Sequence, residues 1–536
     1  MLSITGSYIL LGIIAAVFIG FSVMIALYQL IYWADKQEVW KTIFPRIIII
    51  ISIFLTIFTP LLIPFDAAVS FLTPRATFMT LVWQIFVYIN MIFAFIILPY
   101  LFFIQDIRIE EKVNCFKQYS FAFIQLLILL TIIFAITIIL FYTIGNADIP
   151  TIMIDSATIG DQTGYIENLV KSTNIIMGAS VKTTIVLPLN FQTYLFAIVS
   201  FLGSIMFIIF LGVGTAALPI DLIKKFIRRP KAMSTQQLIK FKKEYITKAQ
   251  RILTKIDTLY LRLTINTPRS VVLRELRYGS DKNLFSNNKK LLKAAIILER
   301  QAQELYQSYS EIIAMNQKDS ANPLKYYFSL VLGILCAIGS FVMAAQYIMV
   351  LIYQFAPQVF KHDRTIAFFL SELCYLAQVG IGVPLISSII FAIVAFFVIF
   401  CYLKGVTKFG FRFILFVSIH PMQKGLTQIS SFLFNASIML IGILASLQFF
   451  TTVFSSFTYG SAAGILFNVG VSNIQYLRYW FHFQYAVLCC VMVISFILCI
   501  FLKPKQIDSD IEDMINNKTE KKAKRKNKIE MRSSKV

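Results

Sequence analysis

The chain has 536 residues, of which 58% are hydrophobic and only 14% are charged. With a mean hydropathy of +0.75, this composition excludes an ordinary soluble globular protein. A formal net charge of +22 would suggest a nucleic-acid partner for a soluble protein. In a membrane protein the same charge is explained by topology and by attraction to an anionic cytosolic leaflet, so no nucleic-acid binding is expected.

Nine apolar stretches are long enough to cross a hydrocarbon core, which takes about 20 helical residues. In chain order they cover residues 7–33, 43–64, 79–104, 119–143, 193–217, 326–354, 380–403, 430–450 and 482–502. No basic residue precedes the first stretch, and it is too long for a signal peptide, so we expect it to remain as an anchor. The sequence therefore predicts an all-α, polytopic membrane protein with nine transmembrane helices.

The basic residues favour one orientation of these helices. With the N-terminus outside, 43 of the 49 Lys and Arg residues fall in inner connections or the tail, and six fall outside. The short loops carry the orientation signal. The inner ones hold three, three and four basic residues, whereas the outer loops around Arg75 and Arg478 hold one each. We therefore expect an outer N-terminus and a cytosolic C-terminus.

The connections divide the chain into four parts. Residues 1–217 hold helices one to five, with an outer loop near 144–192 whose pattern is too weak to predict strands. Residues 218–324 form a basic cytosolic loop, and residues 325–502 hold helices six to nine. Residues 503–536 form a charged cytosolic tail, which is expected to be disordered.

The cytosolic loop contains two heptad patterns. Ser234 and Gln237 form a capping box at a helix start. Apolar residues then recur every three or four positions in two runs: Leu238, Phe241, Tyr245, Ala249, Ile252, Ile256, Leu259 and Leu263, then Leu291, Ala295, Leu298, Ala302, Leu305, Tyr309 and Ile312. Because these seams are narrow and regular, we expect an antiparallel coiled-coil hairpin. The alternative is a pair of amphipathic helices lying on the membrane surface.

The tail combines two blocks of opposite charge. Its acidic residues are Asp508, Asp510, Glu512 and Asp513, and a basic run follows from Lys521 to Lys528. A solvated tail is the simplest expectation for such blocks. A contact with lipid headgroups or a coat protein is the alternative.

No motif of enzymatic chemistry is present in the sequence. It contains no P-loop, Rossmann glycine pattern, G-x-S-x-G, H-E-x-x-H or paired C-x-x-C. His362, His420 and His482 have no metal-ligand spacing with cysteines or carboxylates. We therefore expect a protein that is not an enzyme, with no catalytic residues and no cofactor or metal site.

Two related motifs place a proline two residues before an aspartate. They are Pro64 with Asp66, after the second apolar stretch, and Pro219 with Asp221, after the fifth. We expect the proline to end each helix and the carboxylate to accept the N–H groups that the break leaves free. An asparagine should then be tolerated at either aspartate. The functional alternative is that Asp66 or Asp221 guards a substrate or ion route.

A third candidate segment covers residues 366–385. Its polar residues include Glu372 and Gln378, and Pro384 follows them. The segment is predicted to be an outer amphipathic helix or a re-entrant piece leading into helix seven. Polar groups in interrupted membrane segments often mark binding sites, so Glu372 and Gln378 are pathway candidates, although surface packing is the simpler role.

Together these motifs resemble the limb-region-like membrane protein family. The matching stretches are LLIPFD at 61–66, G-x-x-ALPIDLIK at 214–224, the basic coiled-coil loop, F-x-x-F-C-Y-L-x-G at 397–405, Tyr459-Gly460-Ser461 and the aromatic run 476–485. The family includes the lipocalin-interacting membrane receptor and a lysosomal cobalamin transport escort protein. The escort branch is the more similar, although its glycosylated outer loops have no counterpart here. The resemblance implies nine helices, an outer N-terminus and no enzymatic residues.

The expected function is that of a non-enzymatic receptor or transport escort. Such a protein would contact membrane lipids and would bind partner membrane proteins through its helices and cytosolic hairpin. It would assist the uptake or trafficking of a cofactor, a small molecule or a lipocalin-like ligand. The alternatives are a transporter or channel in its own right and a structural subunit of a larger membrane assembly. Lysosomal, endosomal and plasma membranes all fit.

Overall fold

The computed structural model describes most of the apolar part of the chain. The described residues are 4–34, 42–73, 77–110, 115–154, 180–227, 235–263, 324–360, 365–381, 385–409 and 427–501, with single residues or pairs between 298 and 309 and between 412 and 422. Within these residues, nine helices are long and apolar enough to cross a membrane. The predicted spans are thus confirmed, and the protein is an integral, multi-pass membrane protein.

Most membrane helices extend beyond the predicted apolar stretches. They are α1 (Ile4–Trp33), α2 (Ile43–Leu72), α3 (Thr77–Ile92) continued by η2 (Phe93–Ile97) and α4 (Leu98–Glu110), α5 (Cys115–Ile144), α9 (Phe191–Ile227), α14 (Leu324–Phe355), α16 (Leu385–Phe409), α17 (Ile429–Val453) and α18 (Leu477–Phe501). The shorter elements are β1 (Asn146–Ile154), β2 (Ser180–Pro188), α10 (Thr235–Leu263), η3 (Pro357–Phe360), α15 (Phe369–Ile381), β3 (Arg412–Phe413), β4 (Val417–Ser418) and η4 (Gly464–Val471). Both η2 and η4 are π-helical, a form that occurs mostly as short bulges and often at functional sites.

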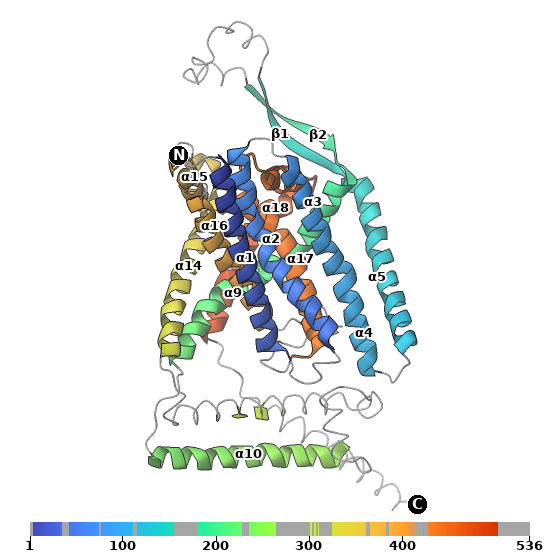
Figure 1. The fold of residues 1–536 in the computed structure, drawn as a ribbon, viewed down its shortest axis with the longest axis vertical. Coiled ribbons are helices and arrows are strands. Elements are labelled where there is room, and N and C mark those ends of the chain that lie inside the picture. The colour runs from blue at the N-terminus through green and yellow to red at the C-terminus, as the bar shows by residue number, and fades with distance from the viewer. Residues whose placement is uncertain are drawn as a thin grey trace, which may run out of the picture. The chain divides into compact units, whose positions relative to one another are not determined.

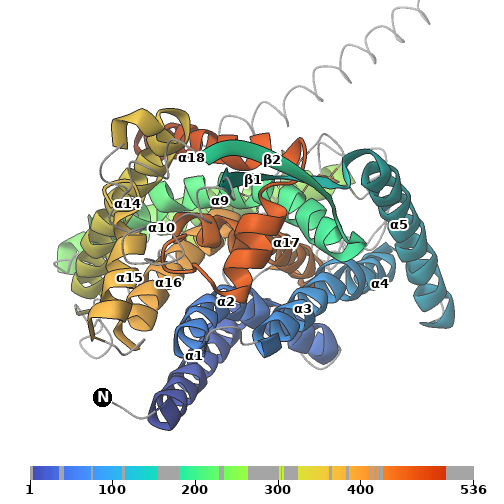
Figure 2. The ribbon, with the colours of Figure 1, turned by 90° about the horizontal axis from the view of Figure 1, so that it is seen from above.

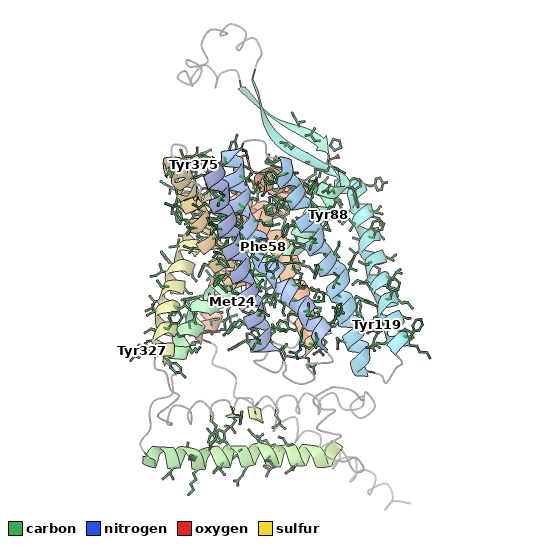
Figure 3. The ribbon with its side chains drawn as sticks, viewed as in Figure 1. Met24, Phe58, Tyr88, Tyr119, Tyr327 and Tyr375 are labelled. Carbon is green, nitrogen blue, oxygen red and sulfur yellow. The ribbon has the colours of Figure 1, made fainter. Side chains whose placement is uncertain are left out.

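The chain folds into two compact units, which are described separately. The first contains Met1–Phe103, Ala122–Leu218 and Cys336–Ile497, and the second contains Ile104–Phe121, Pro219–Leu335 and Leu498–Val536. In the first unit, α2 contacts α1, α16 and α17 (Figure 2). Phe58 of α2 is buried in this bundle, whereas Met24 of α1 is exposed (Figure 3). The apolar interior therefore lies around α2 and α17.

Two glycines bring α9 and α16 into backbone contact in the first unit. A Cβ atom added at Gly214 would overlap the carbonyl oxygen of Cys401, and one added at Gly405 would overlap that of Phe210. Small residues at a helix crossing allow this approach, which strengthens van der Waals packing where lipid supplies no hydrophobic drive. Tyr402 belongs to the same stretch as Gly405 and donates a hydrogen bond from its hydroxyl to the Ile438 carbonyl of α17 at 2.9 Å.

An antiparallel pair of strands extends from one end of the bundle (Figure 1). β1 and β2 pair from Asn146 opposite Pro188 to Ile154 opposite Ser180. The weak pattern of the 144–192 loop did not predict these strands. The Asp148 N–H also donates to the Asn473 carbonyl at 2.9 Å, and the Gln475 N–H donates to the Asn146 carbonyl at 3.0 Å. The strands are therefore anchored to the segment that joins η4 to α18.

The second unit contains the long helix α10, which begins and ends close to the predicted first heptad run. Its Tyr245 packs against Tyr309, with 4.4 Å between ring centroids, and Leu298 is buried. Ser234 of the predicted capping box, most of the second run and the tail lie outside the described residues. In the same unit, the Lys224 ammonium of α9 donates to the Cys499 carbonyl of α18 at 2.6 Å.

We expect Gly214→Ala to weaken the α9–α16 contact, because the added methyl group meets backbone that cannot rotate away. Overpacking of this kind costs about 1–3 kcal/mol of folding free energy. Gly20→Ala on α1 is the matched control, since nothing lies within 4 Å of its added Cβ. Thermal unfolding in detergent should show a lower midpoint for Gly214→Ala only. Equal midpoints for both variants would contradict the close contact.

Candidate functional site

The proline–aspartate motif of α2 lies inside the helix and not at its end. α2 continues through Pro60 and Pro64 to Leu72, so the prediction that Pro64 ends the helix is wrong. Prolines are tolerated in membrane helices where neighbouring groups satisfy the backbone. Pro60 leaves the Thr56 carbonyl without its intrahelical donor, and beside it the Thr59 hydroxyl donates to the Leu55 carbonyl at 2.7 Å. The continuous helix places the next polar residue, Asp66, in the buried interior.

Asp66 accepts hydrogen bonds from two other segments of the first unit and from its own helix. The Trp83 indole N–H of α3 donates to its Oδ2 at 2.8 Å, and the Ala463 N–H donates to the same oxygen at 2.6 Å. The Ala462 N–H donates to Oδ1 at 3.2 Å, and the Ser70 hydroxyl makes a long contact with Oδ1 at 3.5 Å. The carboxylate therefore does accept backbone N–H groups, but they come from residues 462–463 and not from a helix break at Pro64.

These bonds hold the start of a short helix that runs from Ala462 into η4. The first N–H groups of a helix have no partner within it, and a negative charge is favourable beside them. Asp66 accepts two of them, and the Ser461 hydroxyl accepts the next, from Gly464, at 3.0 Å. Gly460 just before has φ +79°, a conformation that favours glycine. The motifs 61–66 and 459–461, far apart in sequence, thus meet at one capping site.

A second buried network of polar groups lies where α17, η4 and α18 meet. The Gln484 amide donates to the Gln448 Oε1 at 2.9 Å, and the Gln448 amide donates to the Ser472 hydroxyl at 2.9 Å and to the Thr452 hydroxyl at 3.1 Å. All four side chains are buried or half-buried. Sequence analysis did not single out these residues or Trp83. The only signal in the sequence was the presence of polar side chains within otherwise apolar stretches. Such a side chain is expected to have a hydrogen-bond partner, but the sequence does not say which residue that partner is.

Glu372 and Gln378 lie on α15, a helix separate from α16. The Glu372 carboxylate accepts from the Ser456 hydroxyl at 2.5 Å, and the Gln378 amide donates to the Ala67 carbonyl, next to Asp66, at 3.3 Å. The hydroxyl of Ser371, the residue before Glu372, accepts hydrogen bonds from the N–H groups of Ser456 and Phe457 at 3.0 and 3.2 Å. These contacts attach α15 to α2 and to the turn before Ser461. Both pathway candidates therefore have structural hydrogen bonds.

The second proline–aspartate motif does not join this site. α9 continues through Pro219 to Ile227, so the prediction that Pro219 ends the helix is also wrong. Asp221 is half-buried within the helix and belongs to the second compact unit, whereas Asp66 belongs to the first. Among the described residues, no three His, Cys, Asp or Glu side chains are placed to hold a metal ion.

Comparisons with known proteins agree over nearly the whole chain. A family model described as LMBR1-like membrane protein matches residues 9–501. A LIMR family protein of Dictyostelium discoideum is 26% identical over 532 residues, which cover 93% of this chain and 98% of the relative. LIMR family proteins of Oryza sativa subsp. japonica and Arabidopsis thaliana are each 24% identical, covering 92% and 89% of this chain and 96% and 93% of the relatives. No solved structure matches the chain significantly.

The hydrogen bonds of Asp66 predict a graded series of variants. Asp66→Asn should lower the free energy of unfolding by about 1–3 kcal/mol, because an amide places N–H groups opposite donors that need an acceptor. This reverses the expectation, made from the sequence, that asparagine is tolerated. Trp83→Phe should cost about 1 kcal/mol through the lost indole bond. Ser70→Ala is the control, since its 3.5 Å contact is weak.

Thermal unfolding in detergent measures this series. A wild-type midpoint for Asp66→Asn would show that the carboxylate does not hold the start of the 462–471 helix.

Proposed function

Because the chain belongs to the LMBR1-like membrane protein family, we propose that it is a non-enzymatic receptor or transport escort. It acts by holding a partner membrane protein and thereby assists the uptake or trafficking of a ligand. The pairing of its buried polar residues supports this role over transport through the Asp66 region. Both oxygens of the Asp66 carboxylate accept hydrogen bonds from the protein itself, and Gln448 Oε1 and Glu372 Oε1 each accept one. A carboxylate whose oxygens are already bonded has little capacity left for a passing cation.

The proposed orientation places the N-terminus outside and α10 and the C-terminus in the cytosol. The support is the charge of the short loops, because basic residues gather in cytosolic connections. In this orientation the pair of strands β1 and β2 faces outward, where a ligand would arrive. The hairpin of α10 with residues 291–312 faces the cytosol, and the Tyr245–Tyr309 contact supports the pairing of its two heptad runs.

Cysteine labelling tests this orientation. A cysteine placed at Gly160 should react with an impermeant maleimide on intact cells, and one placed at Ser280 should react only after permeabilisation. The native cysteines provide the background measurement. Labelling at position 280 on intact cells would reject the orientation.

A polar side chain on the lipid-facing helix α5 supports the proposed binding of a partner. α5 lies at the rim of the bundle in both views, and its apolar residues are mostly exposed (Figures 1 and 2). Gln125 is exposed as well. Of its neighbours, Ile124 and Leu127 are exposed and Leu126 is buried. Gln125 lies six residues, or about 9 Å along the helix, beyond Tyr119, a residue type typical of the membrane interface.

An exposed amide at this depth is unfavourable in lipid and favourable against another helix. In the hydrocarbon region an amide without a partner costs free energy, whereas interhelical hydrogen bonds from Gln stabilise association by about 0.6–2 kcal/mol. We therefore assign the Gln125 face of α5 to a transmembrane helix of the partner, which offers a hydrogen-bonding group at the same depth. This observation carries the proposal of a receptor or escort.

We expect Gln125→Leu to weaken retention of the partner in mild detergent by about threefold to thirtyfold. The thermal stability of the isolated chain should not fall, because the amide is exposed. Thr131→Val is the matched control, since the Thr131 hydroxyl is exposed but already donates to the Leu127 carbonyl at 2.8 Å. Quantitative mass spectrometry of co-purified membrane proteins measures the effect. The same partner recovered at the same ratio from both variants would exclude the Gln125 contact.

A transporter in its own right is the second candidate function. The observation in its favour is Asn435 of α17, which is buried and whose Nδ2 has no hydrogen-bond partner among the described residues. A solute could use this donor. Flux of small polar solutes into liposomes that contain only this chain, lost in Asn435→Leu, would favour the transporter over the escort.

A further inference from the structure

α10 has an exposed apolar stripe in addition to its buried seam. Ile239, Ile246 and Leu253 are 63%, 56% and 53% exposed. They are spaced by seven residues, so they fall on nearly the same face of the helix. Tyr245 and Ile252 are half-buried and lie on the adjoining face, toward Tyr309. The exposed stripe is therefore distinct from the seam that the two heptad runs share, and side chains project from opposite sides of α10 (Figure 3).

Two lysines flank the N-terminal half of this stripe. Lys242 and Lys243 are exposed and lie three and four residues beyond Ile239, one on each side of the line from Ile239 to Ile246. The remaining exposed basic residues described on α10, Lys248 and Arg251, lie on the opposite side of the helix. If the stripe entered a lipid surface, most of the basic charge of α10 would point away from the headgroups. The arrangement instead suits a helix with an apolar face and acidic flanks.

The tail of the same chain contains a segment with this pattern. Ile507, Ile511, Met514 and Ile515 are spaced by four, three and one, which puts them on one face of a helix. The acidic residues Asp508, Asp510, Glu512 and Asp513 occupy the flanks and the back. As a helix the segment is about 12 Å long, close to the distance of about 10 Å from Ile239 to Ile246.

The membrane topology puts the two segments on the same side. Four spans, α14, α16, α17 and α18, separate α10 from the tail, and an even number of crossings returns the chain to the side it left. This argument does not depend on which side is cytosolic. The described part of α18 ends at Phe501, six residues before Ile507.

We propose that residues 507–515 of the tail form an acidic amphipathic helix that docks on the Ile239–Ile246 stripe of α10 in the same chain. Ile507, Ile511 and Met514 cover the apolar stripe, and the acidic flanks pair with Lys242 and Lys243. The contact places the tail on the cytosolic hairpin and makes that surface unavailable to other helices. A partner with a similar acidic amphipathic helix would then compete with the tail.

Site-specific photo-crosslinking in the full chain, reconstituted in lipid nanodiscs, tests this contact. A benzoylphenylalanine at position 246 should crosslink to a tail peptide that contains residues 507–515, within a single chain. The matched control places the same photoreactive residue at position 248, two residues further along and on the opposite face of α10. It should give no crosslink to the tail peptide. Crosslinks from position 246 to lipid, to the tail of a second tagged copy, or to no part of the tail would each overturn the proposal.

Charge exchange provides an independent arm. Lys242→Glu with Lys243→Glu should lower the crosslink yield by about threefold to tenfold. Changing the four tail acids to lysine in that background should restore it. Size-exclusion profiles establish that every variant remains folded. A crosslink yield that the charge exchange leaves unchanged would show that no ionic contact forms between Lys242, Lys243 and the tail. It would thereby overturn the proposal that the acidic tail docks on this stripe.

Discussion

The structure depends on the rule that polar groups buried in a membrane protein must find partners within the protein. Asp66 meets this rule by accepting the Trp83 indole N–H and the first N–H groups of the 462–471 helix. The pairing satisfies both sides, since a carboxylate and the start of a helix are each costly to bury alone. One side chain thereby fixes α2, α3 and the connection between α17 and α18 relative to each other.

The stretches that resemble the family have a common physical explanation. The carboxylate of the 61–66 stretch and the 459–461 turn form one cap, and Gly214 and Gly405, from two further stretches, form one helix crossing. Tyr402, within the second of these stretches, reaches the α17 backbone. These four stretches therefore meet one another or the central helix α17.

The sequence predicts the spans well and the interactions between them poorly. Hydropathy gives nine helices because each span must be apolar over about 20 residues, whatever its neighbours are. The same reasoning fails at Pro64 and Pro219, since a helix in a bundle continues through proline when packing supports it. The partner of Asp66 lies almost 400 residues away along the chain. Spacing within one segment carries no information on such a contact, and the same holds for Gln448 with Gln484.

The attachment of the strand pair has a mechanical consequence. β1 is hydrogen-bonded to residues 473–475, which directly follow the short helix whose other end is held by Asp66. A displacement of the β1–β2 arm would therefore act first on this short helix. Its start is hydrogen-bonded to Asp66, and the residues after its end are hydrogen-bonded to β1. The wider π-helical winding of η4 makes up all of this short helix except its first two residues, which are the ones that the Asp66 carboxylate holds. The arm and the buried centre of the bundle are thus one linkage.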